Sequence, residues 1–361
     1  MKNKILSLSV VVFTAMILAN CENSSSSESF TTGSPIRSAV LTNLSNSVIV
    51  TNYETLNTKA TDMENLISGI TAPMTDTQQT DLKLAWQSAR LEWEQIETVD
   101  YMAPSIKNTV YPAIDSWPVD EVAIGVIIGN GAPITALTLA SNNAVRGFHV
   151  IEYLVWGIDG NKAAADVTDR EIEFLKAAAT DLQDNTQKMF DSWRNDGENY
   201  AANFAYAGKT GSIFPSQKSA LVEIAKGAAA LGNKVADEKI GQPLSGNSGA
   251  PKPEAEESRL SNNTKQDLAN NILGIKNIYM GDFNGADGMG LSDVVILTNP
   301  TLDSSLKTKI TEAIDAIDAI PDTFSTAIIS DRPAVQNARD KMNELTDLIE
   351  TQLLPFLQNL Q

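Results

Sequence analysis

The sequence has very few of the residues on which nucleophilic and zinc-dependent catalysis most often depend. Among 361 residues there is one cysteine, Cys21, and one histidine, His149. No intramolecular disulfide or Cys-x-x-Cys zinc site is therefore possible, and a nucleophilic Cys-His pair could be formed only by these two residues. A His-Glu-x-x-His zinc peptidase is excluded because that motif needs two histidines. The sequence also lacks a glycine-rich phosphate-binding loop of either standard type.

Basic side chains are scarce as well, with 27 Lys and Arg against 45 Asp and Glu, which gives a formal charge of −18. This balance argues against a nucleic-acid partner, because phosphates need a basic surface. It is compatible with a cation as ligand, although an acidic excess is usually just a soluble surface. With 42% hydrophobic residues, the chain is long enough for one large or two ordinary domains.

The N-terminus predicts a secreted protein held by a lipid. Residues 1–20 combine two lysines with an apolar run that is too short for a membrane span, which is typical of a signal peptide. The sequence Leu18-Ala19-Asn20-Cys21 resembles a lipobox, so Cys21 is the expected acylation site. Residues 21–34 are rich in serine and predict a flexible tether. We therefore expect a lipid-anchored protein of the cell envelope, in the outer membrane or facing the periplasm.

From Pro35 onward the hydrophobic spacing is helical, so the expected fold is all-α. Glycines and a proline near residue 208 favour two helical bundles packed together, at 35–207 and 208–361. Capping boxes are expected to open helices at Thr168-x-x-Glu171 and Thr264-x-x-Asp267. The predicted helices cover 36–68, a segment starting at Thr75 or Thr80, 168–193, 216–239, a segment starting at Thr264, 303–320 and 333–354, the last ending before Pro355.

The segment from Gly147 to Gly157 is apolar except for His149 and Glu152, so a helix here would lie in a core. The two residues are three positions apart and therefore project to one side of the helix. Burying both without partners would cost roughly 2–7 kcal/mol for each polar group. One interpretation is a histidine hydrogen-bonded to a glutamate within a helical core. The other is a metal site, since helical bundles build inward-facing metal centres from such pairs.

A second polar group lies on an apolar helix face that carries Trp86, Arg90, Trp93 and Glu97. Arg90 either extends to the edge of the face or pairs with a carboxylate in the interior. The next segment contains two prolines, which exclude a helix interior, and its Asp115 by itself is typical of a turn or a helix cap.

These motifs together resemble the imelysin-like family of bacterial envelope proteins, which is catalogued among the metallopeptidases. The resemblance is carried by Gly147-x-His149-x-x-Glu152, by Trp86-x-x-x-Arg90-x-x-Trp93-x-x-x-Glu97 and by Ile114-Asp115-x-Trp117-Pro118. It implies that Glu97 and Asp115 join His149 and Glu152 at a metal site in the first half, near the interface, with Asp120 as the alternative to Asp115. It also implies that Arg259 and Asp267 face the site from the second half.

The function expected from this resemblance is the binding of a divalent or trivalent metal cation, with iron first because related periplasmic iron-uptake proteins share the motif. Envelope components of iron uptake would then be partners. One nitrogen and three carboxylates suit iron, manganese or calcium better than structural zinc. Two alternatives remain: a metallopeptidase in which Glu152 is catalytic, and an adhesion or scaffolding lipoprotein that needs no metal.

Overall fold

The computed structural model describes residues 34–99, 103–246 and 248–361, and every regular element in these ranges is a helix. The one β-type contact found there is an isolated bridge between Phe283 and Ala286. No helix in these ranges is long and apolar enough to cross a membrane. The all-α prediction is therefore confirmed, whereas the predicted signal peptide and Cys21 lie outside the described residues.

The chain begins with a long helical run made of α1 (Ser34–Asn43), a π-helical turn (Leu44–Val50) and α2 (Thr51–Ser68). This run confirms the helix predicted over residues 36–68. The next helix, α3 (Asp76–Ile96), begins after Thr75, whose hydroxyl accepts a hydrogen bond from the backbone N–H of Gln78. Of the two starts expected for this helix, the structure has the one at Thr75.

Short helices connect α3 to the motif helix. They are α4 (Pro104–Lys107), α5 (Tyr111–Ile114), α6 (Glu121–Gly129), α7 (Ala136–Leu139) and a 3-10 turn (Asn143–Val145). The segment expected to be non-helical thus contains one helical turn, α5, because Pro112 lies in its first turn, where its missing N–H costs nothing. The motif helix α8 (Gly147–Trp156) is buried except at Tyr153, as its apolar sequence predicts.

After a 3-10 turn (Ala164–Asp166), α9 (Asp169–Trp193) opens on the predicted capping box of Thr168 and Glu171. The remaining helices are α10 (Ala201–Ala205), α11 (Gln217–Asn233), a π-helical segment (Lys234–Gly241), α12 (Gln242–Ser245), a 3-10 turn (Pro253–Ala255), α13 (Thr264–Met280), α14 (Leu291–Val295), α15 (Pro300–Asp318), α16 (Phe324–Ser330), α17 (Arg332–Leu348), a π-helical segment (Ile349–Leu353) and α18 (Leu354–Gln358).

Three predicted helix ends were wrong. The helix expected to stop at Lys239 continues to Ser245, and the last helix continues past Pro355. In both cases a π-helical segment precedes the proline, so the missing N–H falls where the α-helical hydrogen-bond register is already broken. The third is Thr264, which is the first residue of α13 and not its cap, because its hydroxyl donates instead to Glu256 and to the backbone of Glu257.

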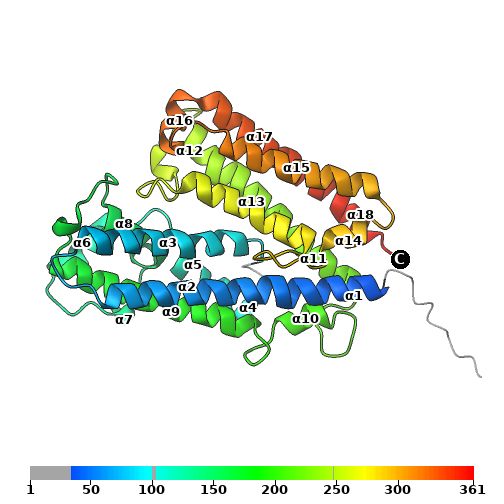
Figure 1. The fold of residues 1–361 in the computed structure, drawn as a ribbon, viewed down its shortest axis with the longest axis horizontal. Helices are drawn as coiled ribbons and strands as arrows, with labels where there is room; N and C mark the ends of the chain where they lie inside the picture. Colours follow the sequence, from blue (N-terminus) through cyan, green and yellow to red (C-terminus); the bar gives the residue numbers. More distant parts are fainter. Residues whose placement is uncertain (1–33, 100–102, 247) are drawn as a thin grey trace, which may run out of the picture. The chain divides into compact units, whose positions relative to one another are not determined.

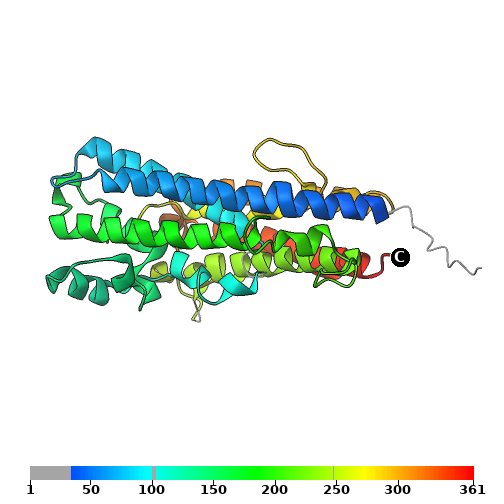
Figure 2. The same ribbon diagram turned by 90° about the horizontal axis from the view of Figure 1, so that it is seen from below.

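The described residues from Ser34 onward belong to one compact unit. In this unit α2 packs against α3 and α9, α3 packs against α13, and α13, α15 and α17 pack in succession. Figure 1 shows α3 beside α13, with α15 and α17 beyond it. In Figure 2 the long run of α1 and α2 (blue) extends beside α9 (green). The boundary near residue 208 stays a prediction.

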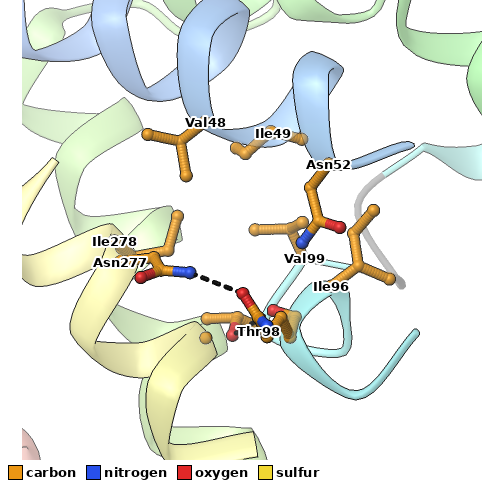
Figure 3. A pocket seen from close by; sticks show the side chains of 10 residues that line it. Val48, Ile49, Asn52, Ile96, Thr98, Val99, Asn277 and Ile278 are labelled. Atoms are coloured by element: carbon orange, nitrogen blue, oxygen red, sulfur yellow. Dashed lines mark hydrogen bonds between the residues drawn. The ribbon is translucent and has the colours of Figure 1, made fainter. Parts of the chain in front are cut away.

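The helices α3 and α13 cross very closely. A Cβ atom added to Gly274 of α13 would lie 2.3 Å from the carbonyl oxygen of Gln95, so only glycine allows this approach. The amide of Asn277 donates to Gln95 Oε1 over 2.8 Å at the same crossing (Figure 3). The cavity drawn there, between the first π-helical turn, α3 and α13, holds only about 10 Å³. Its size suits a single water molecule, so the polar chemistry of the protein has to be sought elsewhere.

Candidate functional site

The glycine of the Gly-x-His motif sets the position of α8. Gly147 has a φ of +78°, and a Cβ atom there would lie 2.2 Å from the carbonyl oxygen of Ile114. The start of α8 is thereby pressed against the residue that precedes Asp115. On the opposite side, Trp86 Nε1 donates to the backbone oxygen of Phe148 over 2.9 Å. These two contacts fix the helix that carries His149 between α3 and the loop that carries Asp115.

Replacing Gly147 with alanine should destabilise the protein by at least about 2 kcal/mol, because the added methyl group meets backbone atoms that cannot rotate away. Gly69→Ala is a matched control, since its nearest neighbour would be the oxygen of Leu66 at an ordinary 3.6 Å. Denaturation midpoints measure both effects. A Gly147→Ala protein as stable as the Gly69→Ala protein would contradict the contact with Ile114.

His149 is fully buried and both of its ring nitrogens face carboxylates. Its Nδ1 lies 2.9 Å from Glu152 Oε2, whereas its Nε2 lies 3.1 Å from Asp115 Oδ1 and 3.4 Å from Glu257 Oε1. Burial and the charge of Arg90 act to lower the pKa of His149, but the hydrogen bonds to these three carboxylates outweigh them and raise it well above its usual value. The ring is therefore an imidazolium when no other cation is present.

Glu152 contacts the His149 ring at Nδ1. Its Oε2 pairs with His149 Nδ1, and its Oε1 accepts hydrogen bonds from the backbone N–H of Ser261 over 2.8 Å and from the Ser261 hydroxyl over 2.7 Å. Both oxygens of this fully buried carboxylate are thus engaged. The structure places Glu152 as an orienting partner of the histidine, on the side of the ring away from Nε2, and not among the atoms that converge there.

Asp115 lies close to His149, as the family resemblance implied. It follows the last residue of α5, and its Oδ2 accepts a hydrogen bond from Trp93 Nε1 over 2.8 Å. Its Oδ1 contacts both Arg90 and His149 Nε2. Burial acts to raise the pKa of Asp115, but the Arg90 guanidinium and the His149 ring together outweigh it, so the pKa is lowered and the group is ionised. Asp120, the alternative, instead caps α6 by accepting from Ala123 N–H.

Glu257 is the third group near His149 Nε2, and the sequence analysis did not predict it. It lies on the loop before α13, and its Oε1 faces both His149 Nε2 and Arg90. Ligand atoms of Asp115, His149 and Glu257 all lie within 4.8 Å of one another. Of these three side chains only that of Glu257 reaches solvent, with 16% of its surface exposed. In this segment the family resemblance implied that Arg259 faces the site, and it gave no role to Glu257.

Arg90 is the centre of the carboxylate cluster. Its guanidinium is fully buried and contacts Asp115, Glu94 Oε1 at 2.5 Å, Asp267 Oδ2 at 3.3 Å and Glu257 Oε1 at 3.3 Å. Arg90 thus pairs with carboxylates in the interior and does not extend to the edge of the helix face. Burial acts to raise the pKa of Asp267 more strongly than Arg90 lowers it, which brings the pKa to about 6.

Glu97, predicted as a ligand, is held by lysines away from the His149 ring. Its Oε1 contacts Lys234 Nζ at 2.5 Å and accepts from the Tyr111 hydroxyl at 2.7 Å, while its Oε2 contacts Lys239 Nζ at 2.6 Å. Burial acts to raise the pKa of Glu97, but the two ammonium groups outweigh it and lower the pKa. With both oxygens engaged in this way, Glu97 is a partner of the lysines and does not join the group at His149 Nε2.

Both lysines reach Glu97 because they lie on a π-helical segment. Residues five apart on an α-helix point about 140° away from each other. In a π-helix, hydrogen bonds join residue i to residue i+5, which brings such residues toward one face. Lys234 and Lys239 stand at this spacing in the segment Lys234–Gly241. Lys239 also contacts Glu94 Oε2 at 2.7 Å and Glu257 Oε2 at 3.1 Å, so it connects Glu97 to the cluster.

The cluster as a whole carries an excess of negative charge. Three basic side chains face six acidic ones, and burial raises the pKa of Glu94 well above its usual value, so at most three negative charges remain before the histidine is counted. The basic residues are Arg90, Lys234 and Lys239, and the acidic residues are Glu94, Glu97, Asp115, Glu152, Glu257 and Asp267. Such a buried excess favours a bound cation.

The supporting residues divide into two groups. Trp86, Trp93 and Asp267 all contact the site or the helix that carries it. Arg259 does not join the cluster through any contact seen in the described ranges, where its Nε has no hydrogen-bond partner. Burial raises the pKa of Glu256, and the charge of Arg259 acts against this rise. The residue that reaches the site from this loop is Glu257.

Comparison with known proteins identifies relatives of the whole chain. The chain is 29% identical over 316 residues to iron-regulated protein A of Synechococcus elongatus, covering 86% of this chain and 84% of that protein. A solved structure from Parabacteroides distasonis, described as an iron-regulated protein A precursor, is 26% identical and superimposes with a TM-score of 0.76 over 88% of this chain and 94% of its own.

An imelysin-like protein from Psychrobacter arcticum has the same fold, with a TM-score of 0.71 and 16% identity over 90% of this chain and 96% of its own. The family model described as imelysin matches residues 49–352, which include every residue of the carboxylate cluster. The chain belongs to the imelysin family.

Proposed function

We propose that this protein binds one metal cation at Asp115 Oδ1, His149 Nε2 and Glu257 Oε1, with iron as the physiological ion. The observation that carries the proposal is that ligand atoms of these three residues lie within 4.8 Å of one another. His149 Nε2 is 3.1 Å from Asp115 Oδ1 and 3.4 Å from Glu257 Oε1. An imidazole nitrogen with two carboxylate oxygens and no thiolate is a donor set suited to iron or manganese.

The surroundings of the three atoms fit this function. Glu152 orients the histidine through Nδ1, which is the usual arrangement behind a metal-bound imidazole. The imidazolium that occupies the site in the absence of a cation can release its proton as the cation binds. The negative excess of the cluster then compensates the charge of a divalent or trivalent ion. Iron is favoured because a relative that matches most of the chain is named an iron-regulated protein.

The peptidase alternative has less support in this geometry. Hydrolysis requires a general base that is not itself a ligand. Glu152, the expected base, is engaged by Ser261 and by His149 Nδ1, and Glu97 is engaged by two lysines. We therefore expect binding without peptide cleavage.

The test is equilibrium dialysis of the purified protein against Fe²⁺ under anaerobic conditions, Mn²⁺, Zn²⁺ and Ca²⁺, with bound metal determined by elemental analysis. The expected result is one iron or manganese per chain and no digestion of unfolded substrate proteins. Failure to retain any of the four ions would overturn the proposal and favour an adhesion or scaffolding role. Digestion that is lost in both His149→Ala and Glu152→Gln would establish a peptidase instead.

We further propose that the protein is anchored in the cell envelope through acylated Cys21. One acyl chain gives only marginal binding to a membrane, so the full lipoprotein modification is expected. The Cys21→Ser protein should therefore leave the membrane fraction when cell lysates are fractionated by centrifugation. Its continued presence there, once an uncleaved signal peptide has been excluded by mass spectrometry, would show that the cysteine is not the anchor.

A further inference from the structure

One exposed segment of the protein has an unusual composition. Between Glu121 and Arg146 the sequence contains no Asp, Glu, Lys or Arg, although charged residues make up 20% of the chain. About five would be expected among these 24 residues at that frequency. The segment contains α6 and α7 and is mostly solvent-exposed. It contributes no residue to the carboxylate cluster, so the proposed metal site does not explain it.

The outer face of α6 lacks the polar side chains of an ordinary surface helix. Val122, Gly125, Val126 and Gly129 follow the spacing of a single helix face, and all four are exposed. Val122 is 79% exposed and Val126 is 62% exposed, whereas the opposite face buries Ile124. A helix that is apolar on both faces is expected to be covered on both.

The surface beside α6 carries an exposed apolar side chain and a groove. Leu137 in α7 is 84% exposed, the highest value for any large apolar residue in the described ranges. Thr138, the next residue, lines a groove of about 410 Å³ whose walls are partly apolar, with Val126, Ile127 and Val145, and partly polar, with Asp120, Ser141 and Asn142. A large apolar side chain beside a partly apolar groove on one surface can form a self-complementary contact, because each copy can supply both parts.

We propose that this face, formed by α6 and α7, binds a second copy of the same chain about a twofold axis, with Leu137 of each copy in the groove of the other. Charge favours this occupant. Two molecules of formal charge −18 repel each other over most of their surfaces, and residues 122–145 contribute no charge, so that Asp120 at the groove is the one charged residue of its lining.

The two glycines on the same face allow a close approach. A Cβ atom added at Gly125 or Gly129 would meet nothing within 4 Å, so the backbone of α6 is open to a neighbouring molecule. By contrast, Gly147, Gly232 and Gly274 are closely covered by other parts of the fold. Helices with small residues four apart can pair with their backbones close together.

A membrane surface is a poorer occupant of this face than a second chain, because helices that lie on lipid carry Lys or Arg on their polar face and α6 has none.

The experiment is sedimentation equilibrium of the full chain in density-matched detergent. Wild-type protein should have twice the mass of one chain. Val126→Glu, which would bury an unpaired carboxylate at the contact, should raise the dimer dissociation constant at least tenfold. Ile329→Glu is the matched control, because Ile329 in α16 is equally exposed at 62%, and it should leave the dimer intact.

Oxidative cross-linking tests the same contact independently. In a full chain that also carries Cys21→Ser, Val126→Cys should give a dimer on a non-reducing gel, and Ile329→Cys should not. A wild-type protein with the mass of one chain, or a dimer that survives Val126→Glu, would overturn the proposal. Monomers that sediment with phosphatidylethanolamine vesicles only when Val126 is intact would show that lipid covers this face instead.

Discussion

The protein with His149 replaced by alanine should bind no metal ion under conditions in which the wild type binds one per chain. The substitution removes the only nitrogen among the three converging atoms and leaves Asp115 and Glu257 facing a void. Isothermal titration calorimetry with Mn²⁺ measures the loss, which should exceed a factor of 100. Glu312→Gln, on the exposed face of α15, is the control and should retain wild-type affinity.

A smaller loss of metal affinity is expected when a residue that supports the His149 ring is replaced. Ser261→Ala removes one of the two hydrogen bonds that fix Glu152, which in turn orients the ring. Loss of such an outer partner weakens metal binding by about 10–100-fold. Full affinity in Ser261→Ala, together with loss in His149→Ala, would show that the ring needs no support from the second half. Retention of stoichiometric metal by His149→Ala would refute the proposed ligand set itself.

The same site should bind metal more weakly as the pH is lowered. Three carboxylates raise the pKa of His149, so its proton competes with the cation for Nε2. Protonated ring is favoured at low pH and excludes the metal, whereas high pH frees the nitrogen. Calorimetry in buffers of different ionisation enthalpy should therefore detect proton release on binding. Affinity that does not change between pH 5 and pH 8 would contradict this competition.

The second large effect concerns folding stability. Arg90→Met should destabilise the protein by about 3–5 kcal/mol, because it leaves buried carboxylates without their cation. Arg90→Ala should cost more, since it also opens a cavity where the side chain packs on the Phe148 ring. Chemical denaturation of both variants measures the difference. A loss of this size is a large part of the total stability of an ordinary domain.

The control for Arg90 is Lys341→Ala, because Lys341 pairs with Glu312 and Glu344 on the surface and should be replaceable without a measurable change. If Arg90→Met and Arg90→Ala had the same midpoint, the packing of the side chain would contribute nothing. If both matched the wild type, the guanidinium could not lie in the buried cluster. A lower midpoint for both, with alanine the lower, is the result the structure predicts.

The sequence by itself determined the fold class and the proximity of His149 to Glu152. Hydrophobic spacing is a local property of a helix, so 36–68, the start of α3 and the capping box at Thr168 could all be predicted. His149 and Glu152 lie three residues apart, which fixes their proximity on any helix. The position of Asp115 came from family resemblance, because nothing local relates a loop residue to a helix more than 30 positions away.

Only the tertiary structure decided which carboxylates meet His149 Nε2. Glu97 directly follows α3, and the lysines of the π-helical segment hold its carboxylate away from His149 Nε2. That segment could not be predicted, because a π-helical register depends on packing and not on local spacing. Glu257 lies 108 residues after His149, and a loop residue has no periodicity to show which way it points. The helix pattern therefore identified the histidine, and the packing of the loop before α13 against α3 and α8 supplied its third partner.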